Sequence, residues 1–375
     1  MQVLNKKYKF GQDDLLSKMN GTTLNGRRLF QNKRGNISAS MADYIDGLHE
    51  IVLEKERKKQ AQDPVNEDER TKLRGLNQSV MWLARQSRPD VMGSCSVTAR
   101  RIMEATMQDI LEMNKVVQHL KRTRDLCLQF ESIHPSVARF VAIADASPYT
   151  KGETHGQGAT IIGITDAKLE AGENAPIGFV AWRSGKIDRS TSSSLAAESY
   201  AMVAATAQLE WVQQLYFEMA AVEPVNDVRK RRIKAWELEK NVAWNQKSVF
   251  VNKGASDQWL KEAMAISDAK SLYDSLKRTA RGKEPRVAVA VAEIRQSLAA
   301  CQGVCRWVPH NIMLCDPLTK EFSKSNAMPL LQCLRDGCYK ISSEEDETTF
   351  RESIKEQGQT VARLKGKSIH LNANK

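Results

Sequence analysis

The feature that most constrains the fold of this chain is a series of three strand-like runs followed by one long helix. The runs span residues 138–147, 156–166 and 175–185, are rich in Val, Ile and Phe, and are separated by turns that contain glycine. They predict an antiparallel meander. Residues 194–219 begin in a cluster of three serines and carry apolar side chains at helical spacing. This segment is therefore expected to be a helix with one buried stripe.

Further strands and helices follow the long helix. Residues 263–268 predict a short strand that ends on an acid, residues 285–300 predict a helix, and residues 305–310 predict another strand. The whole order is strands, helix, strand, helix, helix, strand, helix, which is typical of an α/β fold. We therefore expect residues 136–322 to form a mixed five-stranded sheet flanked by helices.

The regions on either side of this α/β segment have different patterns. Residues 1–66 alternate short apolar pieces with turns, whereas residues 67–135 carry a helical apolar spacing and predict a connector made of helices. The basic segment at about residues 224–259 is interpreted as an insertion between core elements. Residues 323–375 are expected to form a C-terminal tail that is partly helical or disordered.

Composition narrows the class of protein and its compartment. The formal net charge of +11 and the isoelectric point near 9.2 favour a polyanionic partner such as nucleic acid. No apolar run approaches the roughly 18 residues that a membrane-spanning helix needs, so no membrane partner is expected. The seven cysteines include no Cys-x-x-Cys pair, and we identify no signal peptide. This cysteine pattern, together with the lack of an identified signal peptide, favours a cytoplasmic or nuclear location.

Four carboxylates occupy similar places in the predicted elements. They lie at the end of the first strand, in the first turns of the long helix, at a strand-to-helix junction and at the start of the last helix: Asp145, Glu198, Asp268 and Asp316. Such places converge at one edge of an α/β sheet. Carboxylates held this close repel each other unless cations neutralise them. Two Mg²⁺ or Mn²⁺ ions would do so and would suit phosphodiester hydrolysis. Taken singly, each acid has an alternative role as a turn former or as a complement to a helix dipole.

An ordered series of motifs runs through most of the chain. It comprises "RQSRPDVMGSCSV", "HLKRT", "ADAS", "VAWRSGK", "RSTSSSLAAESYA", "SDAKSLYDSL" and "WVPHNIMLCDPLTK". In this order the chain resembles the Pol polyproteins of copia-type retrotransposons. Residues 1–130 look like the end of the reverse transcriptase region, and residues 138–322 look like the ribonuclease H domain.

The resemblance implies a ribonuclease H-like fold with an Asp-Glu-Asp-Asp metal site that binds two Mg²⁺ ions. By that analogy Asp145 would bridge both ions, and Glu198 and Asp268 would hold the ion near the leaving 3′ oxygen. Asp316 would hold the ion that activates water. The implied reaction is endonucleolytic hydrolysis of the RNA strand of an RNA–DNA hybrid. His310, in the loop before Asp316, is a candidate for aiding product release, with a solvated loop histidine as the alternative.

Basic side chains flank the acids in the sequence and are expected to offset the charge of the phosphate backbone. These candidates are Arg183, Lys186, Lys270 and Lys277. A second basic cluster lies in the insertion beside Trp236, where an aromatic ring could stack on a base, and a solvated helix face is the alternative. It comprises Arg229, Lys230, Arg231 and Arg232.

Two other patterns point to functions that we do not assign. Four residues have a spacing one residue away from that of a zinc knuckle: Cys301, Cys305, His310 and Cys315. A strand runs between them and Pro309 precedes the histidine, so we expect buried cysteines and no zinc. The pair Asp13 and Asp14 resembles a polymerase acid pair but follows basic residues instead of an apolar strand. Polymerase activity is therefore not expected from this chain.

Two hypotheses compete with an active hybrid nuclease. The first is a catalytically inactive relic of a retroelement that keeps the fold and binds nucleic acid. The second is a transposase or resolvase with a similar acid cluster, against which the stretches "SSSLAAESYA" and "WVPHNIMLCDPLTK" argue. The partners expected for the nuclease are an RNA–DNA hybrid and other parts of a Pol polyprotein.

Overall fold

The computed structural model of the chain describes residues 21–134, 137–147, 155–219, 263–277, 284–301 and 303–342. The insertion expected at about residues 224–259 and the Asp13–Asp14 pair lie outside these ranges. Within the described part of the chain, no helix has both the length and the apolar character needed to cross a membrane.

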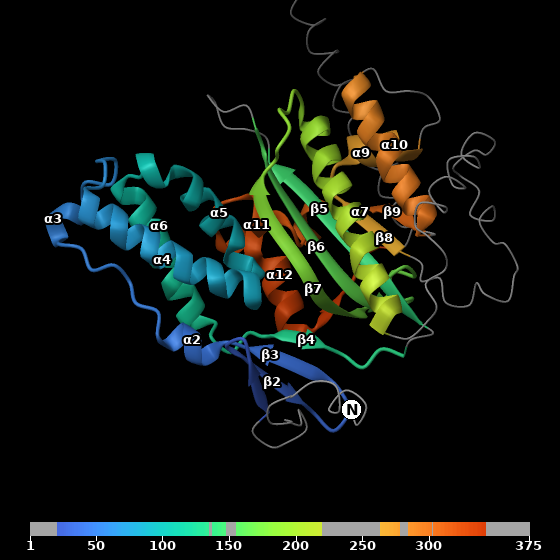
Figure 1. Cartoon of the computed structure of the whole chain (residues 1–375), viewed down its shortest axis with the longest axis horizontal. Helices are drawn as coiled ribbons and strands as arrows, with labels where there is room; N and C mark the ends of the chain where they lie inside the picture. Colours follow the sequence, from blue (N-terminus) through green and yellow to red (C-terminus); the bar gives the residue numbers. More distant parts are fainter. Residues whose placement is uncertain are drawn as a thin grey trace, which may run out of the picture.

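Among the described residues, the larger of two sheets carries six strands in the spatial order β10-β7-β6-β5-β8-β9 (Figure 1). Their bounds are Ala138–Ser147 for β5, Gln157–Asp166 for β6, Ala175–Lys186 for β7, Ala263–Ser267 for β8, Val304–Trp307 for β9 and Cys338–Tyr339 for β10. β6 pairs antiparallel with β5 and β7, whereas β8 pairs parallel with β5 and β9. The prediction of a mixed α/β sheet is confirmed.

Residues 136–322 contribute five strands to this sheet, and the sixth comes from beyond them. The sixth strand, β10, lies in the segment expected to be a tail and pairs Tyr339 with Ala175 of β7. Tyr339 is buried, and its hydroxyl donates to the Ile312 carbonyl over 2.9 Å. Gly337 ends the preceding helix at a φ of +66° and turns the chain back to the sheet. A strand of two residues is too short to leave a visible alternation in the sequence.

β5 lies inside the sheet, between the antiparallel β6 and the parallel β8. All residues from Phe140 to Ala146 are buried, which explains why the strand is an almost continuous apolar run. Its side chains alternate between two cores. Phe140 and Ala142 face one core, and Val141 and Ile143 face the other.

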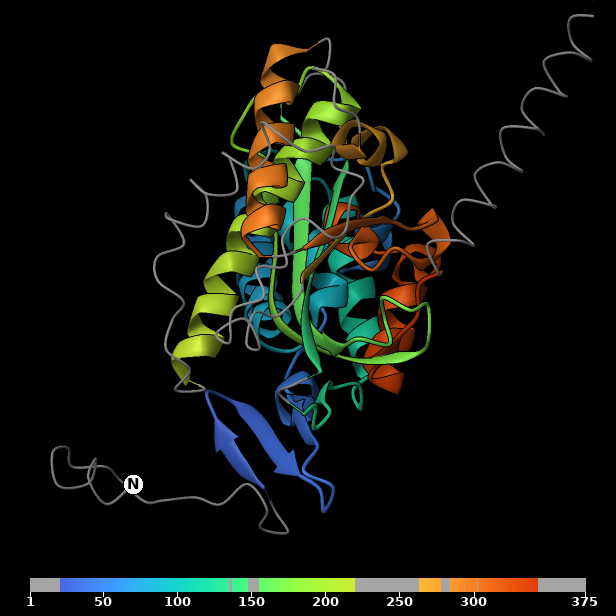
Figure 2. The same cartoon turned by 90° about the vertical axis from the view of Figure 1, so that its right-hand side faces the viewer.

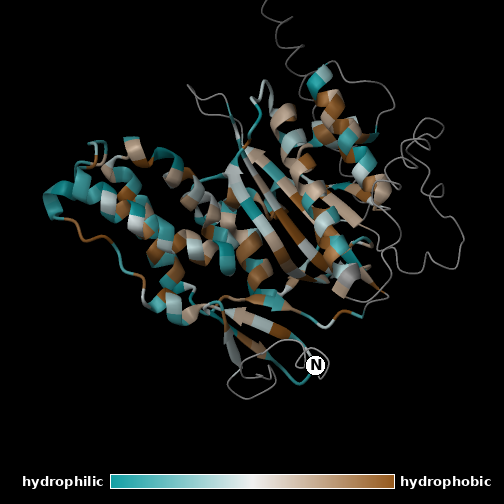
Figure 3. Cartoon of the chain, viewed as in Figure 1, coloured by the Kyte–Doolittle hydropathy of each residue, from teal (hydrophilic) through white to brown (hydrophobic). Residues whose placement is uncertain are grey.

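Helices cover both faces of this sheet (Figures 1 and 2). One face packs against α7 (Ser194–Met219), α9 (Lys270–Lys277) and α10 (Pro285–Ala300). The other packs directly against α5 (Met92–Arg101) and α11 (Asp316–Thr319), while α4 (Glu67–Gln86), α6 (Met107–Arg122) and α12 (Lys324–Asp336) share the hydrophobic core on that side. Figure 3 shows hydrophobic residues along the central strands, whereas the helices carry both kinds of residue. The architecture is therefore three layers, with the sheet in the middle.

The N-terminal part of the chain belongs to the same body. Four short strands, β1 (Thr22–Leu24), β2 (Arg27–Gln31), β3 (Ile37–Ser40) and β4 (Leu128–Phe130), form the second sheet, and α2 (Ala42–Asp46) and α3 (Lys55–Lys58) follow β3. The described residues also form 3-10 turns at Pro89–Val91, Ile102–Glu104 and His310–Ile312. β4 joins the two N-terminal regions because it pairs with β3.

One hydrophobic core runs from the N-terminal helices into the larger sheet. It contains Ile110 and Met113 of α6 together with Ile143 of β5 and Ile161 of β6. The Trp182 indole of β7 also donates to a carbonyl of α4, that of Ala84, over 2.8 Å. The boundaries expected at residues 66 and 135 therefore fall inside a continuous packed unit.

Candidate metal centre

Asp145 lies near the end of β5 and is only 4% exposed. Its Oδ2 atom accepts a hydrogen bond from the Thr319 hydroxyl over 2.6 Å. The same hydroxyl also donates to the backbone carbonyl of Asp316, over 3.1 Å. Thr319 therefore links the carboxylate of β5 to the short helix α11 that carries a second candidate acid.

Asp268 reaches the same edge of the sheet because β5 and β8 are parallel. In their register Ile143 stands beside Ile266, and each candidate acid follows two residues later along its strand direction. Asp268 comes directly after β8, and its side chain is 16% exposed. This register places the two acids at the same end of neighbouring parallel strands, which is the arrangement that the sequence predicted for them.

Glu198 comes from the second turn of α7, the helix that covers this end of β5. The side chain is 6% exposed, and its Oε2 atom is buried without a hydrogen-bond partner. The pKa of Glu198 is raised to about 9, mainly by burial and in addition by the negative charges of Asp145 and Asp268. A buried carboxylate oxygen that accepts no hydrogen bond is costly, and coordination to a cation would compensate for this cost.

Asp316 begins α11 and is buried, yet both of its oxygens have partners. Lys320 Nζ donates to Oδ1 over 2.7 Å, and His310 Nε2 lies 3.0 Å from Oδ2. The other ring nitrogen of His310, Nδ1, lies 3.0 Å from Oδ2 of Asp268. The imidazole, which is 64% exposed, thus stands between two candidate ligands at the surface of the site.

The four carboxylates form two overlapping groups. One ligand oxygen from each of Asp145, Glu198 and Asp268 can be chosen so that all lie within 4.8 Å of one another. Asp268, His310 and Asp316 form a second group by the same criterion. The residue common to both groups is Asp268, whereas the resemblance implies that Asp145 has the shared place.

Two acids of the first group, Asp145 and Glu198, have a raised pKa. The pKa of Asp145 is raised to about 6, mainly by burial and also by the charge of Asp268, against the opposing effect of the hydrogen bond from Thr319. Three buried or half-buried carboxylates therefore cannot all ionise in the protein alone. Hard oxygen donors of this kind fit Mg²⁺ or Mn²⁺, which would keep all three ionised, so the residues present suit a divalent cation.

Thr319 and Lys320 are functional candidates that the sequence did not reveal. Burial alone would lower the pKa of Lys320, but the hydrogen bond to Asp316 and the neighbouring acids raise it above its usual value. Both residues belong to the stretch "DPLTK" and follow Asp316 by three and four positions. The helical spacing of Asp316 and Lys320 is the one signal that would have pointed to their contact.

The basic residues proposed to contact a phosphate backbone lie in three different places relative to the acids. Arg183 and Lys186 are exposed on β7 and flank Ser184, which pairs with Ala159, the β6 partner of Asp145. They thus lie two strands away, on the order of 10 Å from β5. Lys270 and Lys277 lie on α9, where Lys277 stands over the Tyr273 ring. Residues 229–232 lie outside the described residues.

The cysteines of the knuckle-like pattern face different cores. Cys301 and Cys305 lie in the core beneath α7 and α10, whereas Cys315 lies in the core on the opposite face of the sheet. His310 is exposed beside the acids. Burial and the surrounding acids also raise the pKa of the Cys315 thiol well above its usual value. These four side chains therefore do not share one site.

Glu198→Gln is expected to stabilise the cation-free protein at high pH. Because the folded pKa of about 9 exceeds the unfolded value of about 4.3, the native state loses stability as the pH rises between them. The amide cannot ionise, so at pH 8 the free energy of unfolding should increase by on the order of 1–3 kcal/mol, with almost no gain at pH 4. Urea unfolding in a chelator measures this. Glu210→Gln, on the same helix, is the control and should change stability equally at both pH values. An equal gain from Glu198→Gln at both pH values would contradict the prediction.

Comparison with known proteins adds one structural similarity. Neither a protein-family model nor a curated protein matches the chain. Among solved structures, the chain is similar to the ribonuclease H1 of the halophilic archaeon Halobacterium salinarum NRC-1, with 14% sequence identity and a TM-score of 0.24. The similarity covers 46% of this chain and 86% of that chain.

Proposed function

We propose that this chain is a metal-dependent nuclease that hydrolyses the RNA strand of RNA–DNA hybrids. The observation that carries the proposal is the meeting of Asp145, Glu198 and Asp268 at one edge of a mixed sheet, with Asp316 in an overlapping group. The order of three antiparallel strands, one long helix and two parallel strands supports a ribonuclease H-like fold for residues 136–322. We further propose that the chain derives from a copia-type retrotransposon Pol polyprotein, on the strength of its motif series.

The residues of the first group are the better placed to hold a cation. Glu198 offers an oxygen without a donor, and Asp145 and Asp268 stand within reach of it. Asp316, together with Asp268, would hold a second ion. Bound Mg²⁺ or Mn²⁺ would supply activation of a water molecule and stabilisation of the leaving oxygen. Thr319 would hold Asp145 in place through its hydrogen bond.

The chain's own basic residues would orient the substrate. Arg183 and Lys186 are exposed at the same end of the sheet as Asp145, where they could contact a phosphate backbone. His310 is exposed and contacts two of the acids, so its ring stands where it could aid product release. The net charge of +11 supports a polyanionic substrate.

The test is cleavage of one labelled RNA sequence in three contexts, as an RNA–DNA hybrid, as double-stranded RNA and as single-stranded RNA. We expect endonucleolytic products from the hybrid alone, in Mg²⁺ or Mn²⁺ and not in a chelator. Cleavage of all three substrates would contradict the hybrid assignment. Cleavage in the presence of a chelator would contradict metal dependence.

One observation favours the inactive relic as a second candidate. Asp316 already has Lys320 on one oxygen and His310 on the other, so a second cation must displace a partner. A relic would bind the hybrid in a gel-shift assay and leave it intact at every Mg²⁺ concentration. The same hybrid assay therefore separates the two candidates.

A further inference from the structure

The two ends of α11 are enclosed by residues from the N-terminal helices. We call residues 316–322 the acidic strap, after the candidate acid Asp316 with which it begins. The strap also carries Thr319 and Lys320. Gly93, in the first turn of α5, lies against its backbone. A Cβ atom at Gly93 would stand 2.3 Å from the Pro317 carbonyl oxygen and 2.6 Å from that of Lys320. No side chain fits there, so the helix approaches the strap as closely as its backbone allows.

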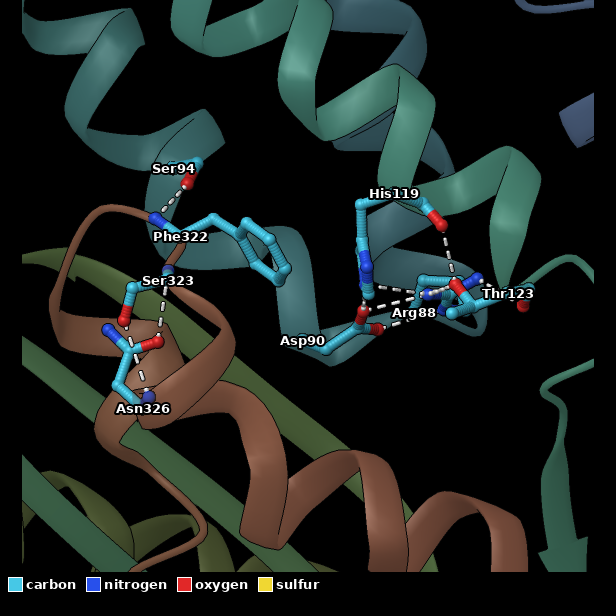
Figure 4. A network of polar contacts seen from close by, with 8 residues as sticks. All are labelled: Arg88, Asp90, Ser94, His119, Thr123, Phe322, Ser323 and Asn326. Atoms are coloured by element: carbon cyan, nitrogen blue, oxygen red, sulfur yellow. Dashed lines mark hydrogen bonds and ion pairs between the residues drawn. The ribbon is translucent and has the colours of Figure 1, made fainter.

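The last residue of the strap, Phe322, is held in the same region (Figure 4). Its backbone N–H donates to the Ser94 hydroxyl over 2.7 Å. Its ring lies against the ring of His119 from α6, with the centroids 4.2 Å apart. The middle of the strap is also tied to β7, because the Ser184 hydroxyl donates to the Leu318 carbonyl. The strap therefore has fixed contacts at its start, middle and end.

A fully buried ion pair supports the residues that hold the strap. Arg88 donates from Nε and Nη2 to the two oxygens of Asp90, each over 2.8 Å, and neither side chain is exposed. Arg88 also donates to the Thr123 hydroxyl and carbonyl at the end of α6. His119 Nε2 lies 2.9 Å from Asp90 Oδ2. Figure 4 shows this network beside Phe322, between α5 and α6. Together these contacts fix the junction from which Gly93, Ser94 and His119 reach the strap.

We infer that the N-terminal helices position the candidate metal centre, with Gly93 and Ser94 as positioning residues that act through the acidic strap. Asp316 lies in the strap and Thr319 contacts Asp145, so a shift of the strap moves Asp316 relative to Asp268 and disturbs the hydrogen bond that holds Asp145. Outer residues that orient metal ligands typically contribute 10- to 100-fold to metal affinity. The role in cation binding rests on the proposed function, whereas the packing itself does not. The active unit would then include residues 67–135 as well as residues 136–322.

The experiment compares Gly93→Ala with Gly75→Ala in the full chain. The control glycine lies on the exposed side of α4, where an added Cβ would meet nothing within 4 Å. The probe is Mg²⁺ alone, titrated while the melting temperature is measured. We expect Gly93→Ala to raise the Mg²⁺ concentration for half-maximal stabilisation by about 10-fold or more. Gly75→Ala should leave it unchanged. Hydrogen exchange should rise in residues 316–322 of Gly93→Ala and not in the control.

Ser94→Ala is the milder variant in case Gly93→Ala does not fold. It removes only the acceptor of the Phe322 N–H, and its matched control is Ser79→Ala, whose hydroxyl bonds within its own helix. We expect a several-fold increase in the half-maximal Mg²⁺ concentration for Ser94→Ala and none for Ser79→Ala. Unchanged Mg²⁺ midpoints in folded Gly93→Ala and Ser94→Ala would overturn the inference while leaving hybrid cleavage by the wild type intact. If the wild type cleaves no hybrid but the midpoints shift, the proposed function fails and the positioning role stands.

Discussion

Asp145→Asn is expected to reduce hybrid cleavage at saturating Mg²⁺ by at least about 1,000-fold while the protein stays folded. The buried Asp145 stands in the same group of ligand oxygens as Glu198 and Asp268. Removing its charge weakens cation binding where the reaction occurs, and each 1.36 kcal/mol of lost transition-state stabilisation costs tenfold in rate. The substitution also relieves repulsion among the acids, so the cation-free protein should be at least as stable as the wild type.

The measurement is the initial rate of hybrid cleavage over a range of Mg²⁺ concentrations, with thermal unfolding as a check on folding. Asp166→Asn is a matched control, because Asp166 also ends a strand but pairs with Ala138 at the other end of β5. It should cleave at the wild-type rate. Cleavage by Asp145→Asn within tenfold of the wild type would remove Asp145 from the centre and with it the proposed nuclease.

The sequence was sufficient to predict the meeting of Asp145 and Asp268, because both follow apolar runs and strand ends of parallel strands converge. It was also sufficient for most of the α7 stripe, since Ala205 and Leu209 recur at helical spacing and are buried, whereas Met219 at the end of the predicted stripe is exposed. These are local patterns. Each rests on a pattern within single elements, either an apolar run that ends on an acid or a stripe at helical spacing.

The contacts that sequence patterns could not predict join residues far apart in the chain. The apolar face of α6 indicated burial, but nothing in its spacing shows that it shares a core with β5 and β6. The hydrogen bond from Thr319 to Asp145 spans 174 positions and depends on where α11 packs. Asp268 belongs to both groups of ligand oxygens, and its membership of the second group likewise depends on the position of His310. Such details follow from tertiary packing, which periodicity does not encode.

Asp90→Asn is expected to lower the free energy of unfolding by about 3–5 kcal/mol, the usual cost of removing one partner from a buried ion pair. Arg88 would keep its charge in a site with no solvent exposure. Burial alone would raise the pKa of Asp90, but the charge of Arg88 and the hydrogen bonds from His119 and Arg88 outweigh it and hold that pKa well below its usual range. Because the folded pKa is lowered, the pair stabilises the protein above about pH 4 and is lost only as the pH falls below that value.

Denaturant unfolding at pH 7 measures the loss, and Asp68→Asn is the control. Asp68 pairs with Lys72 on the exposed side of α4, where such pairs contribute at most about 1 kcal/mol.

The double variant Arg88→Met with Asp90→Leu should recover much of the stability, because apolar residues of similar size leave no unpaired charge. It should not recover the wild-type Mg²⁺ midpoint, since His119 would lose the Asp90 carboxylate that orients its ring against Phe322. A loss below 1 kcal/mol for Asp90→Asn would mean that the junction holding the strap does not depend on this pair. Recovery of both stability and Mg²⁺ midpoint in the double variant would mean that shape alone, and not the charged network, positions the strap.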